Sequence, residues 1–222
     1  MTAVDGTALP RRERNRRGQG DRLREDLIAA AIAMVEENEG KRLSLRSVAR
    51  RVGIAATSVY LHFPDIDHLL DAVVQRSFAR LTTTAAEAAK EAADPAEQLR
   101  NRCRAYCRFG LEHPSLYQLM FQADLPLATV GDDPGATPGL QAFEKLVAAV
   151  DQCLQEGLAP AYDDPFRLAS LIWTAEHGIV LARITRPTFP WPPIDSFVDE
   201  MVDRIMGFDV PPGNGRKASG PV

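Results

Sequence analysis

The chain has 222 residues, of which 45% are hydrophobic and 25% are charged, so it is long enough and apolar enough to bury a globular core. No apolar run approaches the roughly 20 residues that cross a bilayer, and the Arg-rich amino-terminal segment is not followed by a hydrophobic one. The sequence therefore predicts a cytoplasmic protein with no membrane partner. Three cysteines, an odd number, argue against a disulfide framework.

Charge is distributed unevenly along the chain. The formal net charge is −4, yet residues 1–64 hold twelve Lys and Arg against eight Asp and Glu. Since phosphate attraction is needed only where nucleic acid is met, this asymmetry predicts a DNA-binding part on an acidic body. Residues 1–20 include the run RRERNRR without apolar periodicity, which predicts a disordered basic arm. The arm is either a solubilising tail or a segment that lies along phosphates or in the minor groove.

The first predicted helix covers residues 21–38, with Asp21 as its N-cap and Gly40 after its end. Its apolar face would brace the two short helices that follow it. The first of these begins after Ser44, a good N-cap, and Leu43 would pack on the helix as a hydrophobic staple. Gly53 follows this helix, where a left-handed backbone is needed, so the chain is predicted to turn sharply there.

The second short helix is predicted over residues 55–63. Helical spacing places Ala56, Val59 and Phe63 on one apolar face, and leaves an outward face that is short, polar and aromatic. Such a face suits a DNA major groove, because hydroxyls reach base edges or phosphates and small apolar groups contact thymine methyls. The alternative is an ordinary helical hairpin with a solvated outer surface.

The segment from Ile54 to Phe63, followed by Pro64 and Asp65, resembles the signature of the TetR family of bacterial transcriptional regulators. Its sequence Tyr-Leu-His-Phe at 60–63 matches the Tyr-x-His-Phe of that family. The sequence departs from the family where Ala55 replaces a frequent Ser and where Asp65-Ile66 replaces a common Ser-Lys pair, which removes a phosphate contact. The resemblance and the outward face together predict DNA contacts by seven residues: Ser44, Arg46, Thr57, Ser58, Tyr60, Leu61 and His62.

The rest of the chain is predicted to be helical as well. Apolar periodicity and helix-starting prolines indicate helices over residues 65–93, 95–113, 114–121, 139–156, 165–184 and 194–208. A loop is predicted over 123–138 and an unstructured tail over 210–222. No segment alternates as a strand. The expected fold is all-α, with an amino-terminal three-helix helix-turn-helix head over residues 21–66 and a helical effector-binding and dimerisation body over 67–209.

Few residues suggest chemistry. We found no phosphate loop, no nucleophile elbow and no metal-binding His-Glu-x-x-His. His68 is interpreted as a surface histidine, and Cys103 and Cys107, four residues apart, as buried small hydrophobic residues rather than a metal or redox site. No catalytic residue, metal or cofactor is predicted, although a helical metalloenzyme or haem protein is the competing class.

One helix carries polar residues where they are costly. Glu176 and His177 lie within a nearly continuous apolar helix and must be paired or reach a cavity. Trp-x-x-x-His-Gly at 173–178 resembles a branch of the TetR family in which this region borders the effector cavity and the last two helices form the dimer interface. The resemblance, with the predicted helix packing, implies a cavity for a small apolar effector among Tyr106, Phe109, Met120, Phe121, Trp173 and His177.

The sequence thus predicts a DNA-binding transcriptional regulator that is not an enzyme. We expect a homodimer whose heads bind a palindromic operator and release it when a small apolar effector enters the body, which would make it a repressor. A DNA-binding regulator without an effector is the alternative within this class.

Overall fold

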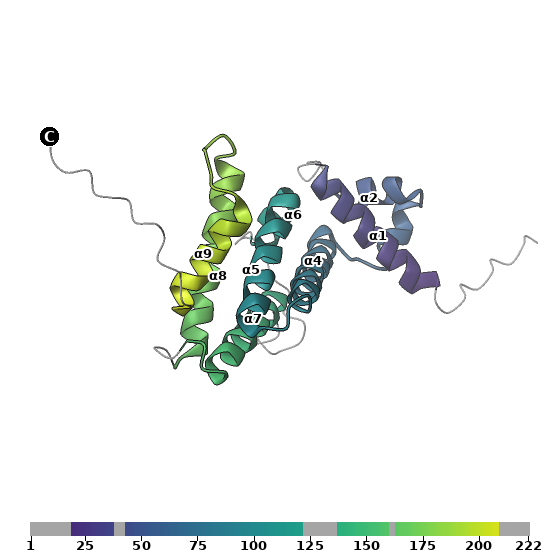
Figure 1. Cartoon of the computed structure of the whole chain (residues 1–222). Coiled ribbons are helices and arrows are strands. Elements are labelled where there is room, and N and C mark those ends of the chain that lie inside the picture. Colours follow the sequence, from purple (N-terminus) through teal and green to yellow (C-terminus); the bar gives the residue numbers. More distant parts are fainter. Residues whose placement is uncertain (1–18, 38–42, 122–136, 160–162, 209–222) are drawn as a thin grey trace, which may run out of the picture.

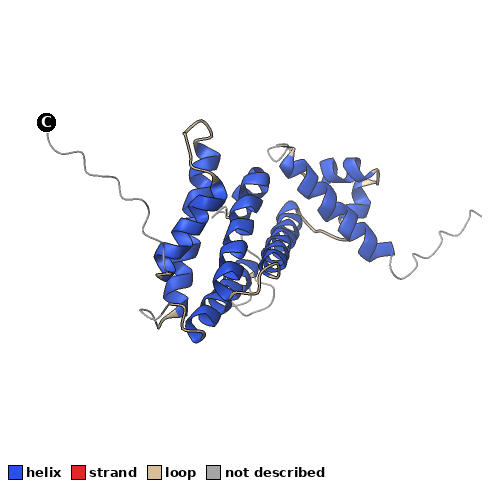
Figure 2. Cartoon of the chain, viewed as in Figure 1, coloured by secondary structure: helices blue, strands red, loops and turns tan. Residues whose placement is uncertain are grey.

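The computed structural model describes residues 19–37, 43–121, 137–159 and 163–208, and within these ranges every regular element is a helix (Figure 2). The predicted all-α fold is therefore confirmed. The basic arm before residue 19, the site of Gly40, most of the predicted 123–138 loop and the tail lie outside the described residues. The helices, shown in Figure 1, are α1 Gln19–Glu36, α2 Leu45–Val52, α3 Ala56–Val59, α4 Ile66–Ala89, α5 Pro95–Glu112, α6 Pro114–Met120, α7 Pro138–Gln155, α8 Pro165–Thr185 and α9 Ile194–Met206.

Local sequence signals set most of the helix starts. Ser44 accepts a hydrogen bond from the backbone N–H of Ser47, whose hydroxyl accepts one from the Ser44 N–H in return, which forms a capping box at α2. Helices α4, α5 and α8 are capped by Asp65, Asp94 and Asp164, whose side chains each accept a hydrogen bond from the backbone N–H three residues later. Gly53 has a φ of 80°, as predicted for the sharp turn after α2.

Several helix boundaries differ from the sequence prediction by one to four residues. Helix α1 begins at Gln19, so Asp21 lies in its first turn rather than at its N-cap. Helix α3 ends at Val59, because the N–H groups of His62 and Phe63 both bond to the Val59 carbonyl in a tight turn before Pro64. Helix α4 ends at Ala89 rather than near residue 93, since Asp94 caps the next helix.

Two apolar cores meet along the middle of the molecule. The first fills the head, α1–α3, together with α4, and extends to Phe109, Leu116 and Met120. The second joins α5, α7, α8 and α9, which form the body with α6. Tyr106 and Phe121 pack against both cores, so they connect head and body. Figure 1 shows α8 and α9 at the side of the body opposite to the head.

A ladder of ion pairs fastens α5 to α9. Arg100 Nε lies 2.7 Å from Asp203 Oδ1, and Arg104 Nε lies 2.6 Å from Asp199 Oδ1. Arg108 pairs with Asp195 at the next turn. The arginines on α5 and the aspartates on α9 each recur every four residues, so each set lies on one helix face. Because the aspartate numbers fall as the arginine numbers rise, the two helices run antiparallel.

Candidate DNA interface and effector cavity

The helix-turn-helix leaves a polar and aromatic surface in solvent. Val59 and Phe63 are buried in the head core, as predicted, whereas Tyr60 is 52% exposed and Leu61 is 83% exposed. Thr57 and Arg46 are also exposed, and Arg46 shares a shallow hollow with Tyr60 between α2 and the start of α4. These exposed hydroxyl, guanidinium and aliphatic groups, carried by α2 and by α3 with the turn after it, are of the kinds that contact DNA phosphates and base edges in the major groove.

The other residues predicted to contact DNA are less available to a partner, because they are half-buried or already hydrogen-bonded. The Ser44 hydroxyl is engaged in the capping box, although the residue is exposed. Ser58 and His62 are half-buried, and His62 lies beside the start of α1 at Gly20. Of the three arginines of α2, Arg51 binds Glu37 at the end of α1, at 2.5 Å, so it fastens two helices of the head together.

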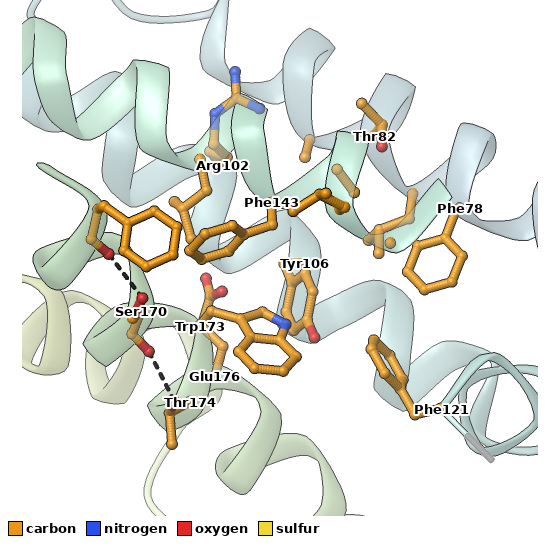
Figure 3. A pocket seen from close by; sticks show the side chains of 17 residues that line it. Phe78, Thr82, Arg102, Tyr106, Phe121, Phe143, Ser170, Trp173, Thr174 and Glu176 are labelled. Carbon is orange, nitrogen blue, oxygen red and sulfur yellow. Dashed lines mark hydrogen bonds between the residues drawn. The ribbon is translucent and has the colours of Figure 1, made fainter. Parts of the chain in front are cut away.

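A cavity of about 430 Å³ lies between α4, α5, α7 and α8 (Figure 3). Its walls are apolar and carry six aromatic rings, contributed by Phe78, Tyr106, Phe121, Phe143, Phe166 and Trp173. The rings interlock: Phe143 stands edge-on to both Phe166 and Trp173, with ring centres 5.3 Å and 6.2 Å apart. A largely apolar hollow with few polar groups is the usual architecture of a small-molecule site.

The structure brings together only part of the predicted cavity set. Tyr106, Phe121 and Trp173 line the cavity. Phe109 and Met120 do not, because both are buried in the core next to α4. His177 stands behind the wall, where its ring stacks on Trp173 with centres 5.7 Å apart.

Sequence reasoning missed the wall supplied by α4 and α7. Phe78, Leu81 and Phe143 line the cavity but carry no signal other than ordinary helical periodicity. The periodicity marks a buried face without telling whether that face meets another side chain or a void.

Of the two polar residues that are costly in the apolar part of α8, His177 is paired and Glu176 reaches the cavity. His177 Nδ1 lies 2.8 Å from the Tyr117 hydroxyl, which is 2.8 Å from the Tyr106 hydroxyl, so three polar groups satisfy one another inside the body. Burial lowers the pKa of His177. Glu176 is only 2% exposed and lines the cavity. Burial raises the pKa of its carboxyl to about 8, opposed by a hydrogen bond from Cys103 and by the charge of Arg102.

The other predicted local roles agree with the structure. Cys103 and Cys107 are fully buried and free, and burial raises the pKa of both thiols, so neither is a reactive thiolate. His68 is exposed, with Nδ1 2.7 Å from Asp65 Oδ1. Across the described ranges, no three His, Cys, Asp or Glu side chains gather as metal ligands would. None of the helices in those ranges is long and apolar enough to span a bilayer.

The fold and the exposed motif define a helix-turn-helix protein with a larger helical body. Comparison with known families agrees: the model for "Bacterial regulatory proteins, tetR family" matches residues 27–73, and that for "Tetracyclin repressor-like, C-terminal domain" matches residues 99–205. The chain belongs to the TetR family of bacterial transcriptional regulators. It is therefore a regulator and not an enzyme.

Curated relatives carry names of the same kind. An HTH-type transcriptional repressor of Mycobacterium tuberculosis is 29% identical over 176 residues, which are 78% of this chain and 62% of the relative. The match thus spans less than two thirds of that protein's length. The nucleoid occlusion factor SlmA of Escherichia coli is 27% identical over 186 residues, which are 78% of this chain and 88% of SlmA.

Solved structures share the fold. A protein from Rhodococcus sp. RHA1 superposes with a TM-score of 0.70 at 27% identity, covering 84% of this chain and 95% of that one. A TetR family transcription regulator from Marinobacter aquaeolei VT8 gives a TM-score of 0.59 at 21% identity, covering 86% and 97%.

Proposed function

We propose that this protein is a homodimeric repressor that binds a palindromic operator through its two heads and releases it when a small, largely apolar molecule fills the cavity. The observation that carries the DNA-binding part is the exposure of Tyr60, Leu61 and Thr57 at the end of the motif, beside the exposed Arg46. Hydroxyl, aliphatic and guanidinium groups exposed side by side are the combination that contacts DNA phosphates and base edges. The family membership of the chain supports the same reading.

The dimer would form through α8 and α9. Leu168, Ile172 and Val180 of α8 are buried within the chain, whereas Leu171 on another face of the helix is 50% exposed. Gly178 has open space where a Cβ would stand. A face that combines exposed apolar and small residues permits close approach of a second copy, and a two-fold axis there would set the two heads at a fixed spacing.

The effector would act through α4. Phe78 of α4 lines the cavity, and its ring stands edge-on to that of Phe121, with centres 5.5 Å apart. Helix α4 begins directly after the motif, so a ligand that displaces Phe78 would move the head. Only a ligand that binds the non-DNA conformation more tightly can shift the equilibrium in this way.

The DNA-binding face is tested by truncating it. Tyr60→Ala should weaken operator binding about tenfold in a mobility-shift titration while circular dichroism is unchanged, since the side chain is exposed. Arg46→Ala should also reduce the salt dependence of binding by about one counterion. Lys145→Ala, which removes a positive charge from the exposed surface of α7, away from the motif and the proposed dimer helices, is the matched control. Unchanged operator affinity in both head variants would refute the assignment.

The cavity is tested by Trp173→Ala. This variant should alter the response to an effector and leave effector-free operator binding nearly intact, because Trp173 lines the cavity far from the motif. An unfolded variant would instead indicate that Trp173 is required for packing.

A further inference from the structure

Two buried polar atoms of the cavity lining have no hydrogen-bond partner among the described residues, Glu176 Oε1 and Arg102 Nε. Glu176 Oε1 accepts no hydrogen bond from any described residue, although the side chain is 98% buried, being 2% exposed. Figure 3 shows its carboxyl among the rings of Tyr106, Phe143 and Trp173. Unsatisfied buried carboxyl oxygens are rare in native proteins and call for a partner.

Neighbouring polar groups of the wall are already engaged. The hydroxyls of Ser170 and Thr174 each donate to a carbonyl of α8 at 2.7 Å, and the Tyr106 hydroxyl lies 2.8 Å from that of Tyr117. These groups therefore have little to offer a ligand. Glu176 is the polar group best placed to orient a molecule in the cavity.

We propose that the cavity binds a small apolar cation, an aryl or alkyl ammonium whose charged nitrogen pairs with Glu176 while its apolar part lies on the aromatic rings. This inference rests on the proposed function, in which the cavity is the effector site. Ionising a buried carboxyl is costly, and an ammonium in the cavity would supply a positive charge at its unpartnered oxygen. The faces of Trp173, Phe143 and Tyr106 attract a cation at the same place.

An anionic ligand fits the part of the cavity around Glu176 less well. Arg102 is the other charged side chain of the lining, and its Nε is buried without a partner in the described chain. Figure 3, however, shows its guanidinium directed away from the carboxyl of Glu176. A carboxylate among the rings would therefore lie beside Glu176, whose ionisation it would oppose, and at a distance from the guanidinium of Arg102, the positive group that the described residues give to the lining.

The protonation of Glu176 gives the proposal a measurable signature. Burial raises the pKa of Glu176 to about 8, so a permanently positive ligand must displace a proton below that pH. The pKa values of the groups that face it are shifted from their own ordinary values as well: burial raises the pKa of Cys103, Cys107, Tyr106 and Tyr117 and lowers that of His177 and of Arg102. Helices α4 and α7 contribute only apolar residues and Thr82 to the lining. Between about pH 6.5 and 9, Glu176 is thus the group in and around the cavity that changes charge.

The test compares three probes that share one skeleton: phenylbutylamine, phenylbutanol and phenylbutanoate. Each is titrated into the full chain by calorimetry, and into a Trp191→Phe variant in which Trp173 is the remaining tryptophan and reports on the cavity by fluorescence. We expect the amine to bind at pH 8 about tenfold or more tightly than the alcohol. Its affinity should rise up to about tenfold per pH unit below the pKa of Glu176 and level off above it, while that of the alcohol stays flat.

Two variants assign the effect to Glu176. Glu176→Gln should lower amine affinity by about tenfold or more, remove its pH dependence and leave alcohol affinity unchanged. Glu144→Gln, which removes the same charge from the exposed face of α7, is the matched control and should bind the amine like the native protein.

The proposal is overturned if the amine fails to bind, if its affinity is independent of pH, or if the alcohol or phenylbutanoate binds as tightly. If Glu176→Gln does not fold, the pH dependence of amine affinity in the native protein still tests the proposal. Operator binding without any probe is measured in parallel by mobility shift. Its absence in the native protein would refute the proposed function, whereas a failure confined to the amine refutes only this inference.

Discussion

The Nδ1 atom of His113, at the junction of α5 and α6, lies 2.7 Å from Oε1 of Glu36 near the end of α1, and this contact joins body to head. Arg80 of α4 completes the contact, with Nη2 3.0 Å from His113 Nε2 and Nη1 3.8 Å from Glu36 Oε1. Three helices therefore meet at one polar node on the path between cavity and motif. A movement of α6, whose neighbour Phe121 lines the cavity, would reach α1 through this node.

The node predicts a measurable energetic coupling. In a double-mutant cycle with Glu36→Ala and His113→Ala, urea unfolding should give a coupling energy of about 0.5–1 kcal/mol, the range of partly exposed polar pairs. Both single variants should remain folded, because each side chain is at the surface of its core. Additive losses would show that the contact does not link the two parts.

Gly110 should not tolerate a side chain. A Cβ at this position would stand 2.5 Å from Val180 Cγ1 and 2.9 Å from Tyr117 Cδ2, so Gly110→Ala must displace α8 or the Tyr117 ring. We expect a loss of about 1–3 kcal/mol in the free energy of unfolding, as for other overpacked cores. Adding Val180→Ala should recover part of this loss, and a double variant no more stable than Gly110→Ala would contradict the packing described.

If the dimer forms through α8 and α9, a large side chain added on α8 should disrupt it, whereas the same side chain on α7 should not. Gly178→Arg should convert the protein toward monomer in sedimentation experiments at micromolar concentration, because a long charged side chain would enter the interface. Glu144→Arg places the same side chain on the exposed surface of α7 and should leave the oligomeric state unchanged. A monomeric native protein would contradict both the dimer and the palindromic operator.

Glu176 predicts that stability falls as the pH rises. Its pKa is about 8 in the folded protein, against 4.5 for an ordinary Glu, so the folded state holds a proton that the unfolded state has lost between these values. The contribution is fully present below about pH 4.5 and is lost as the pH passes 8. Relative to Glu176→Gln, the free energy of unfolding should decrease by up to about 1.4 kcal/mol per pH unit in this window. Urea unfolding at pH 6 and pH 8 measures the difference; parallel profiles would show that Glu176 is not buried as described.

The sequence by itself determined the helices and the motif. Ser44 and Gly53 act through their own backbones and nearest neighbours, so their roles as N-cap and left-handed turn can be predicted without a partner. The burial of Val59 and Phe63 follows from helical spacing in the same way. The family signature lies in this local segment, which is why the class of protein could be predicted.

Tertiary structure alone decided which aromatic residues face the cavity. Phe109 and Phe78 are both periodic, buried-face residues, yet Phe109 fills the core while Phe78 lines the void, because the outcome depends on how α4, α5 and α7 are rotated against one another. The same holds for the pairing of Arg104 with Asp199, residues far apart in the sequence that antiparallel packing of α5 and α9 brings to 2.6 Å. Periodicity in the sequence shows which face of a helix is buried. The neighbour that covers this face is set by long-range packing, and local residue spacing does not indicate it.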